Sequence, residues 1–229
     1  MESFNDFCNN ILIIMTTFNR KRVTKLCLEN IDKYRRSASL CVLDDHSTEY
    51  DLEELKSWTR SSAVVRLPNK MGINNLRVAA HKIAQKNNSK YVYHIDNDAY
   101  HDPNWMIRMY ELSQEHKGVL GLYNTSHHFV ATIKENTDVI HRRACPGLSF
   151  FYEVSALKEV PTTFNNSWDF LFGDRIGNTL ISKISYVEHL GADGIHNADF
   201  ERDRAHNPTL WLKRERARLI PLLMNKETP

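Results

Sequence analysis

The stretch YVYHIDNDAYHDPNW, residues 91–105, decides the fold of this chain. Its first five residues, Tyr91 to Ile95, are rich in aromatic and β-branched side chains, which predicts a β-strand. Asp96 and Asp98 follow that strand directly. Asp102-Pro103 then predicts an N-cap ahead of a proline at the first position of a helix. A strand that ends in acidic residues and continues into a helix is one repeat of an α/β fold.

Three further strand and helix pairs precede this stretch. Apolar runs predict strands at residues 11–15, 40–43 and 63–67, and helical spacing of apolar residues predicts helices at 21–34, 52–58 and 72–86. Strands and helices therefore alternate over about 115 residues. This alternation predicts an α/β, doubly wound and mostly parallel sheet flanked by helices.

The second half of the sequence is less regular, and its strands can be antiparallel. The pattern predicts strands at 119–123 and 128–133 paired around a turn at Asn124, and a strand at 148–154 before a short helix. It also predicts a helix at 168–181, a last strand at 184–190 and a basic helix at 211–223 that Pro221 interrupts. Because we find no linker or repeat, we expect a single domain over residues 1–229.

Composition excludes several classes of protein. The 229 residues are 41% hydrophobic and 25% charged, and 30 Lys and Arg against 28 Asp and Glu leave a charge of +2, which gives no strong nucleic-acid signal. The longest apolar run, residues 11–15, is too short for a transmembrane segment, and the N-terminus does not resemble a signal peptide. We expect a cytoplasmic protein, free or peripheral to a membrane. The cysteines are scattered, which predicts reduced core thiols at Cys8, Cys27, Cys41 and Cys145.

Three polar clusters fall at the carboxyl ends of predicted parallel strands, where open α/β sheets bind ligands. These clusters are residues 16–20, Asp44-Asp45 and Asp96-Asn97-Asp98. Two carboxylates one residue apart can place oxygen ligands on one Mg²⁺ or Mn²⁺, and such an ion would neutralise a diphosphate. An isolated Asp-x-Asp is more often a turn or capping pair. Because three polar clusters each follow a predicted strand, we favour a ligand-binding site over a turn or capping pair.

At these positions the chain resembles the family 2 glycosyltransferases of the GT-A fold. Residues 16–20, TTFNR, are similar to the family's P-T-Y-N-R, and residues 43–49, LDDHSTE, resemble its V-D-D-G-S-T-D. Gly72 and Arg77 match the glycine and arginine of its N-x-G motif, and residues 91–105 resemble its strand, Asp-x-Asp and proline-started helix. The departures are Thr16 for proline, His46 for glycine and Val78 for asparagine.

The resemblance implies an enzyme of the hexosyl and glycosyltransferase class (EC 2.4), which moves a sugar from a UDP-linked or similar nucleotide-sugar donor. The acceptor would be the hydroxyl of a glycan or another molecule, the cofactor Mn²⁺ or Mg²⁺, and the reaction inverting. Residues 1–115 would form the donor half and 116–229 the acceptor half. By the same resemblance the nucleotide-sugar would contact Thr16, Thr17, Phe18, Arg20, Asp44 or Asp45, Gly72, Arg77, Asp96 and Asn97.

The same resemblance implies the metal and catalytic residues. Asp98 would hold the metal with Asp96, and His189, or otherwise His196, would be a further metal ligand. Asp169 fits the family's spacing for the catalytic base better than Asp174 does. An N-capping role for the aspartate and a structural role for the histidine are the alternatives.

Other functions remain open from the residues themselves. A nucleotidyltransferase of nucleotide-sugar synthesis would also use acidic residues and Mg²⁺, but its first strand should lead into a glycine-rich loop, whereas TTFNRKR follows here. A non-catalytic nucleotide- or sugar-binding module is a second alternative. A DNA-modifying transferase is a third, because the last helix is basic at Lys213, Arg214, Arg216 and Arg218, although such a face is usually solvated.

Overall fold

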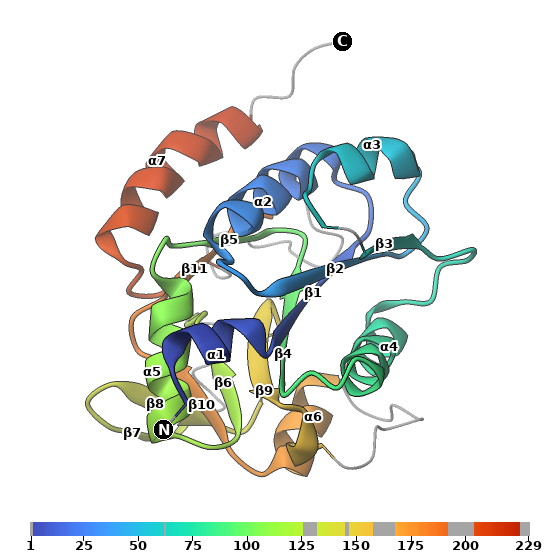
Figure 1. Cartoon of the computed structure of the whole chain (residues 1–229). Coiled ribbons are helices and arrows are strands. Elements are labelled where there is room, and N and C mark those ends of the chain that lie inside the picture. Colours follow the sequence, from blue (N-terminus) through green and yellow to red (C-terminus); the bar gives the residue numbers. More distant parts are fainter. Residues whose placement is uncertain are drawn as a thin grey trace.

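The protein is described by a computed structural model (Figure 1). It describes residues 2–61, 63–125, 132–144, 147–157, 168–191 and 204–224, except for the side chains of 169–171 and 224.

The first part of the chain forms a parallel sheet with the strand order β3-β2-β1-β4. The four strands are β1 (Ile11–Thr17), β2 (Ser39–Asp44), β3 (Ala63–Arg66) and β4 (Tyr91–Asp96). All seven residues of β1 are buried because helices cover both faces of the sheet (Figure 1). Ile13 belongs to the same buried cluster as residues of α2 (Lys21–Tyr34), whereas Ile14 belongs to a second cluster with residues of α4 (Ile73–Lys86). α3 (Leu52–Ser57) joins β2 to β3.

The second part extends the same sheet through antiparallel pairing. β9 (Ser149–Glu153) pairs antiparallel with β4, and the complete order is β3-β2-β1-β4-β9-β6-β10-β8-β7. The remaining strands of this sheet are β6 (Val119–Gly121), β7 (Thr132–Glu135), β8 (Val139–Arg142) and β10 (Thr179–Ser182). β5 (Ala99–His101) and β11 (Val187–His189) form a separate antiparallel pair, which brings the last strand against the segment after β4. The fold is therefore α/β with a mixed nine-stranded sheet and a parallel core.

The other helices are α1 (Phe4–Asn9), α5 (Trp105–Glu115), the 3₁₀ turn η2 (Val154–Ala156), α6 (Trp168–Ile176) and α7 (Leu210–Met224). α1 was missed from the sequence. Its signal is Ser3, whose side chain accepts a hydrogen bond from the Asp6 backbone N–H as an N-cap. None of the helices among the described residues is long and apolar enough to cross a bilayer.

The structure confirms the strands and helices predicted for residues 11–96 and the strand near 148–154, and corrects five predictions further on. α5 begins at Trp105 with Asn104 as its N-cap, because a turn held by Asp102 precedes it. β6 lies between β9 and β10 instead of pairing with the following segment, of which 128–131 lie outside the described residues. Pro221 lies within α7, which continues through it to Met224, so the missing backbone N–H of this proline removes one helical hydrogen bond without ending the helix.

The helix predicted for 168–181 and the strand predicted for 184–190 are both shorter. α6 ends at Ile176 because Gly177 adopts a left-handed conformation, with φ of 84°, and Thr179 already belongs to β10. β11 spans only Val187–His189; before it, the Tyr186 backbone N–H donates to the Leu122 oxygen, while the Tyr186 oxygen accepts from the Asp102 backbone N–H. Cys8, Cys27 and Cys41 are buried free thiols as expected, while Cys145 lies outside the described residues.

Candidate active site

The carboxyl ends of β1, β2 and β4 meet at one edge of the sheet. The parallel register places Thr16 opposite Asp96 and Thr17 opposite Asp44. Thr16 Oγ1 donates to Asp96 Oδ1 at 3.1 Å, and Thr17 Oγ1 donates to Asp44 Oδ1 at 2.9 Å. The three polar clusters predicted from the sequence are thus joined by direct hydrogen bonds.

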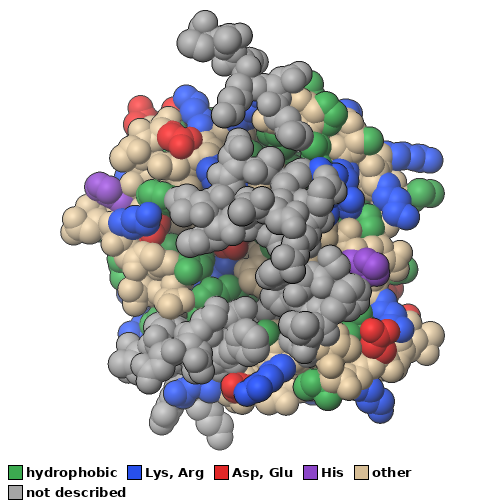
Figure 2. Space-filling model, turned by 180° about the vertical axis from the view of Figure 1, so that it is seen from behind, with side chains coloured by type: hydrophobic (Ala, Val, Ile, Leu, Met, Phe, Trp, Pro, Cys, Tyr) green, Lys and Arg blue, Asp and Glu red, His purple; other side chains and the backbone are tan. Residues whose placement is uncertain are grey.

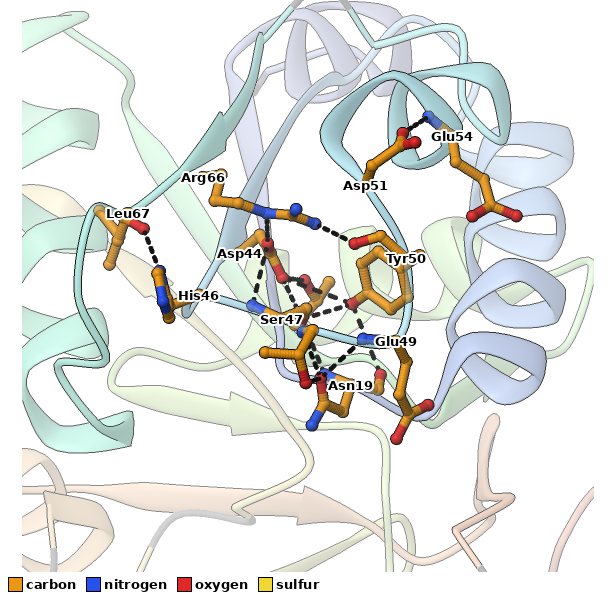
Figure 3. Close-up of polar contacts among 12 residues, drawn as sticks. Asn19, Asp44, His46, Ser47, Glu49, Tyr50, Asp51, Glu54, Arg66 and Leu67 are labelled. Carbon is orange, nitrogen blue, oxygen red and sulfur yellow. Dashed lines mark hydrogen bonds and ion pairs between the residues drawn. The ribbon is translucent and has the colours of Figure 1, made fainter.

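Asp44 is the centre of a buried polar network (Figure 3). Its side chain is 0% exposed and forms an ion pair with Arg66. The Ser47 hydroxyl and the Ser47 backbone N–H also donate to it, and the Tyr50 hydroxyl lies 3.4 Å from Oδ1. With its oxygens occupied in this way, Asp44 fixes the loop after β2.

Asp45 has a different environment. Its carboxylate accepts hydrogen bonds from the backbone N–H groups of Met71 (2.6 Å) and Gly72 (3.0 Å), at the start of α4. Gly72 has φ of 79°, a conformation that favours glycine and that lets the chain turn into the helix. Nearby in sequence, Lys70 Nζ lies 3.7 Å from the centre of the Phe18 ring, so that the loop before α4 contacts the loop after β1.

Asn19 ties the loop after β1 to the loop after β2. Its backbone N–H donates to Ser47 Oγ (2.7 Å), and its Oδ1 accepts from the Thr48 backbone N–H (2.8 Å), as Figure 3 shows in part. Asn97 Nδ2 donates to the Asn19 backbone oxygen (3.2 Å) and to Thr24 Oγ1 (2.7 Å). Asn97 therefore supports the loop that carries Arg20. Asn19 was quoted in the sequence motif but was not predicted as a site residue.

Two of the three departures from the family motifs, His46 and Thr16, have structural explanations. His46 adopts a left-handed conformation with φ of 66°, which agrees with the glycine expected there, and its Nδ1 lies 3.2 Å from the Leu67 backbone oxygen (Figure 3). Thr16, in place of proline, adds the hydroxyl that bonds Asp96.

Asp98 lies in a compact cluster with one arginine and one histidine. Its Oδ2 is 2.5 Å from Arg20 Nη1 and 2.8 Å from His189 Nε2, and its side chain is 6% exposed. Burial by itself raises the pKa of Asp98, but the charge and hydrogen bond of His189, together with those of Arg20, outweigh burial and hold the pKa well below its ordinary value. Asp98 is therefore ionised at neutral pH.

The second oxygen of Asp98, Oδ1, is buried and has no hydrogen-bond partner among the described residues. A buried carboxylate oxygen without a partner is costly, so it is a natural ligand for a bound cation. Gly191 lies over the cluster, because a Cβ there would overlap Arg20 Nη2, Asp98 Oδ2 and His189 Nε2. Sequence reasoning missed Gly191, for which the signal is its place two residues after His189.

Asp96 is less buried than Asp98, with 30% of its side chain exposed, and it pairs with Arg77 Nη2. Burial raises the pKa of Asp96, the Arg77 charge opposes that rise and the Asp98 charge adds to it. Arg77 itself is 0% exposed, so it is not a surface charge of α4. Its predicted approach to the diphosphate stays a prediction.

The side chains of Asp98, His189 and Asp96 fit a hard divalent cation that oxygens of the substrate help to bind. Mg²⁺ typically takes one or two protein carboxylates together with substrate phosphates, and Mn²⁺ also accepts imidazole. Asp98 supplies a carboxylate and His189 an imidazole, and Asp96 is the more exposed carboxylate beside them. In the part of the chain that the structure describes, no three acidic, histidine or cysteine side chains form a complete ligand group. The described residues alone would therefore leave positions on the cation open, which oxygens of a bound diphosphate can fill.

The remaining candidates are Asp169, Asp174 and His196, and among them the structure describes the side chain of Asp174 alone. Asp169 is the second residue of α6, so it does not occupy the N-cap position, which precedes the helix. Its side chain lies outside the described part. Asp174 is 53% exposed and lies 3.9 Å from Arg143. His196 lies outside the described residues. On the face in Figure 2, the described Lys and Arg side chains are interspersed with Asp and Glu and do not gather in one basic patch.

The fold and the site define an α/β protein whose polar cluster lies at the carboxyl edge of a parallel sheet, where such proteins bind ligands. Known structures share this fold. S. aureus TarS 1-349 matches with a TM-score of 0.57 and 20% identity over 77% of this chain and 59% of that one. The same fragment in complex with UDP-GlcNAc has a TM-score of 0.57 and 18% identity over 96% and 68%. The mannosyltransferase PcManGT from Pyrobaculum calidifontis, in complex with GDP-Man and Mn²⁺, has a TM-score of 0.60 and 16% identity over 82% and 59%.

The chain thus spans about three fifths of the length of TarS 1-349 and of PcManGT. No curated protein sequence matched the chain. The sequence profile of Glycosyl transferase family 2 matches residues 12–159, which is more than half of the chain. The chain therefore belongs to glycosyl transferase family 2, a family of nucleotide-sugar-dependent glycosyltransferases (EC 2.4), and its fold is of the GT-A type.

Proposed function

We propose that this chain transfers a sugar from a nucleoside diphosphate-sugar, UDP-linked in the first instance, to an acceptor hydroxyl by an inverting single displacement. The observation that carries the proposal is the cluster at the ends of β1 and β4, in which one oxygen of the ionised Asp98 has no hydrogen-bond partner among the residues that the structure describes. A divalent cation that binds the diphosphate of the donor would supply positive charge next to this oxygen. The nucleotidyltransferase and the non-catalytic module remain the alternatives.

The donor would lie across the edge of the sheet. Asp45 would accept a hydrogen bond from the nucleobase, beside Phe18, while Asp98 and His189 would hold Mn²⁺ or Mg²⁺. When bound, the cation neutralises charge that develops on the departing diphosphate. Arg20, which already pairs with Asp98, places a second positive charge at the same end of the site.

The acceptor would be activated from α6. Asp169 would remove the proton of the acceptor hydroxyl while that oxygen attacks the anomeric carbon from the side opposite the diphosphate. This proposal rests on the position of Asp169 in α6 and on the resemblance to the family. A covalent enzyme nucleophile is not needed.

A thermal-shift screen tests the proposal. UDP, GDP and TDP, and their sugars, are added to the purified protein with Mn²⁺ or with EDTA. A ligand at a hundred times its dissociation constant should stabilise the native state by about 2.7 kcal/mol, and only with Mn²⁺ present. Asp98→Asn should abolish the metal-dependent shift, whereas Glu53→Gln, which alters an exposed carboxylate on α3, should retain it. The proposal fails if no nucleotide stabilises the protein, or if EDTA and Asp98→Asn leave the shift intact.

A further inference from the structure

Arg77 is a buried cation with too few polar partners. It stands on α4, is fully buried, and donates from Nη2 to Asp96 Oδ1 and to the Gly147 backbone oxygen, the latter at 3.3 Å. Its Nε and Nη1 have no hydrogen-bond partner among the described residues. A charged guanidinium is stable in such a place only if other groups offset its lost hydration.

Two aromatic rings supply that compensation. The guanidinium carbon of Arg77 lies 4.9 Å from the centre of the Trp168 ring and 5.5 Å from that of Phe150. The two rings stack on each other, with centres 4.9 Å apart and an angle of 30° between their planes. A cation within about 6 Å of an aromatic face is attracted by the ring quadrupole, most strongly for tryptophan and more so away from water.

These contacts connect two parts of the proposed site. Asp96 ends β4 on the donor side, whereas Trp168 is the first residue of α6, the helix that carries Asp169. Arg77 touches both, so it lies between the donor carboxylate and the helix assigned to the acceptor. The orientation of the Arg77 guanidinium toward Asp96 therefore depends on the aromatic rings that pack against it.

We propose that Trp168 is a positioning residue for the donor site, because its indole holds the Arg77 guanidinium against Asp96. The inference rests on the proposed function. Without the indole, Arg77 loses its strongest aromatic contact, and Asp96 loses a fixed partner at the point where the metal and diphosphate would bind. Affinity for the metal-bound nucleotide should then fall, although Trp168 itself touches neither.

A matched control separates this role from simple core packing. Phe172 belongs to the same buried aromatic cluster and meets Trp168 edge to face, with ring centres 6.1 Å apart. The cation contacts of Arg77 are with Phe150 and Trp168 and not with Phe172. Phe172→Leu therefore removes aromatic packing from the cluster and leaves the arginine contact in place.

The experiment measures the affinity of the protein for UDP with Mn²⁺ by calorimetry, or for GDP or TDP with Mn²⁺ if the screen selects one of them. Trp168→Met should weaken binding about tenfold. Trp168→Phe should restore most of the affinity, since it returns a π face, and Phe172→Leu should bind as the native protein does. In the Asp96→Asn background, Trp168→Met should have no further effect, because the carboxylate that it positions is gone.

Native affinity in Trp168→Met, or equal losses with and without Asp96, would overturn the inference. If Trp168→Met does not fold, Arg77→Lys tests the same contact between Arg77 and Trp168, since lysine keeps the charge but lacks the planar guanidinium. That variant should show the same loss, and native affinity there would also overturn the inference. If the native protein itself binds no metal-bound nucleotide, the proposed function fails first, so the two failures are distinct.

Discussion

Asp98 Oδ2 lies 2.8 Å from His189 Nε2, although 91 positions separate the two residues in the chain. The contact exists because β11 pairs antiparallel with β5, with His189 opposite Ala99. β11, a strand from the second half of the chain, thus places a histidine against the carboxylate that follows β4. The arrangement needs a close approach of the backbone just after His189, which Gly191 provides.

Gly191→Ala should disturb this cluster while leaving the fold intact. The added Cβ would overlap the side-chain ends of Arg20, Asp98 and His189, which must move apart. We expect the Mn²⁺-dependent affinity for nucleotide to fall at least about tenfold, and the free energy of unfolding without metal to change much less. Calorimetry and urea unfolding measure the two quantities. Gly147→Ala is the control, since a Cβ there meets only ordinary contact at 3.8 Å; equal affinities in the two variants would contradict this role of Gly191.

The sequence left open whether Asp44 or Asp45 contacts the nucleobase. Their environments in the structure predict different effects of alanine substitution on stability and on nucleotide affinity. Asp44→Ala breaks a buried ion pair with Arg66 and should lower the free energy of unfolding by about 3 to 5 kcal/mol. Asp45→Ala removes a carboxylate that has only two backbone partners, and should mainly weaken nucleotide binding, by roughly 1 to 3 kcal/mol. Urea unfolding and calorimetry on both variants check the assignment. Loss of stability in Asp45→Ala with unchanged affinity would return the base contact to Asp44.

Local patterns predicted the strands and helices of residues 11–96 well, and pairing between distant segments explains what they could not predict. The seven buried residues of β1 show an unbroken apolar pattern through Met15, so its place inside a parallel sheet can be read from the sequence. The three buried residues of β6 carry no information on their partners, which are β9 and β10. Likewise Asp-x-Asp is visible in the sequence, whereas the contact of Trp168 with Arg77 depends on how α6 packs against α4.

Asp169 and Asp174 stand in one helix and provide a comparison of catalytic roles. Asp174 is 53% exposed and pairs only loosely with Arg143, so Asp174→Asn should leave turnover nearly unchanged. Asp169→Asn should lower turnover about 10²-fold or more with donor affinity nearly constant, because a base acts on the acceptor proton in the transition state. Initial rates and nucleotide binding measure the two effects. If Asp174→Asn alone is inactive, the base is Asp174, and if both variants are active, the proposed inverting mechanism is wrong.

Stability should fall in mild acid because of buried histidines, of which His101 is the simplest to test. His101 is 0% exposed, its Nε2 lies 2.8 Å from the Tyr93 hydroxyl, and burial lowers its pKa to about 3. Below an unfolded pKa of about 6.5, the unfolded chain binds a proton that the folded chain excludes, so each unit of pH decrease costs up to about 1.4 kcal/mol per such histidine. Above that pH, the two states bind protons equally and the effect vanishes.

His101→Phe should therefore make the free energy of unfolding fall less steeply between pH 6.5 and 4, as measured by urea unfolding at several pH values. Burial also lowers the pKa of His81 and of His94, so some slope should remain. Tyr93→Phe is the matched control, because it removes the same hydrogen bond and keeps the imidazole. It should lower stability at pH 8 without flattening the slope. An unchanged slope in His101→Phe would mean that this imidazole is protonated in the folded protein, in conflict with its complete burial.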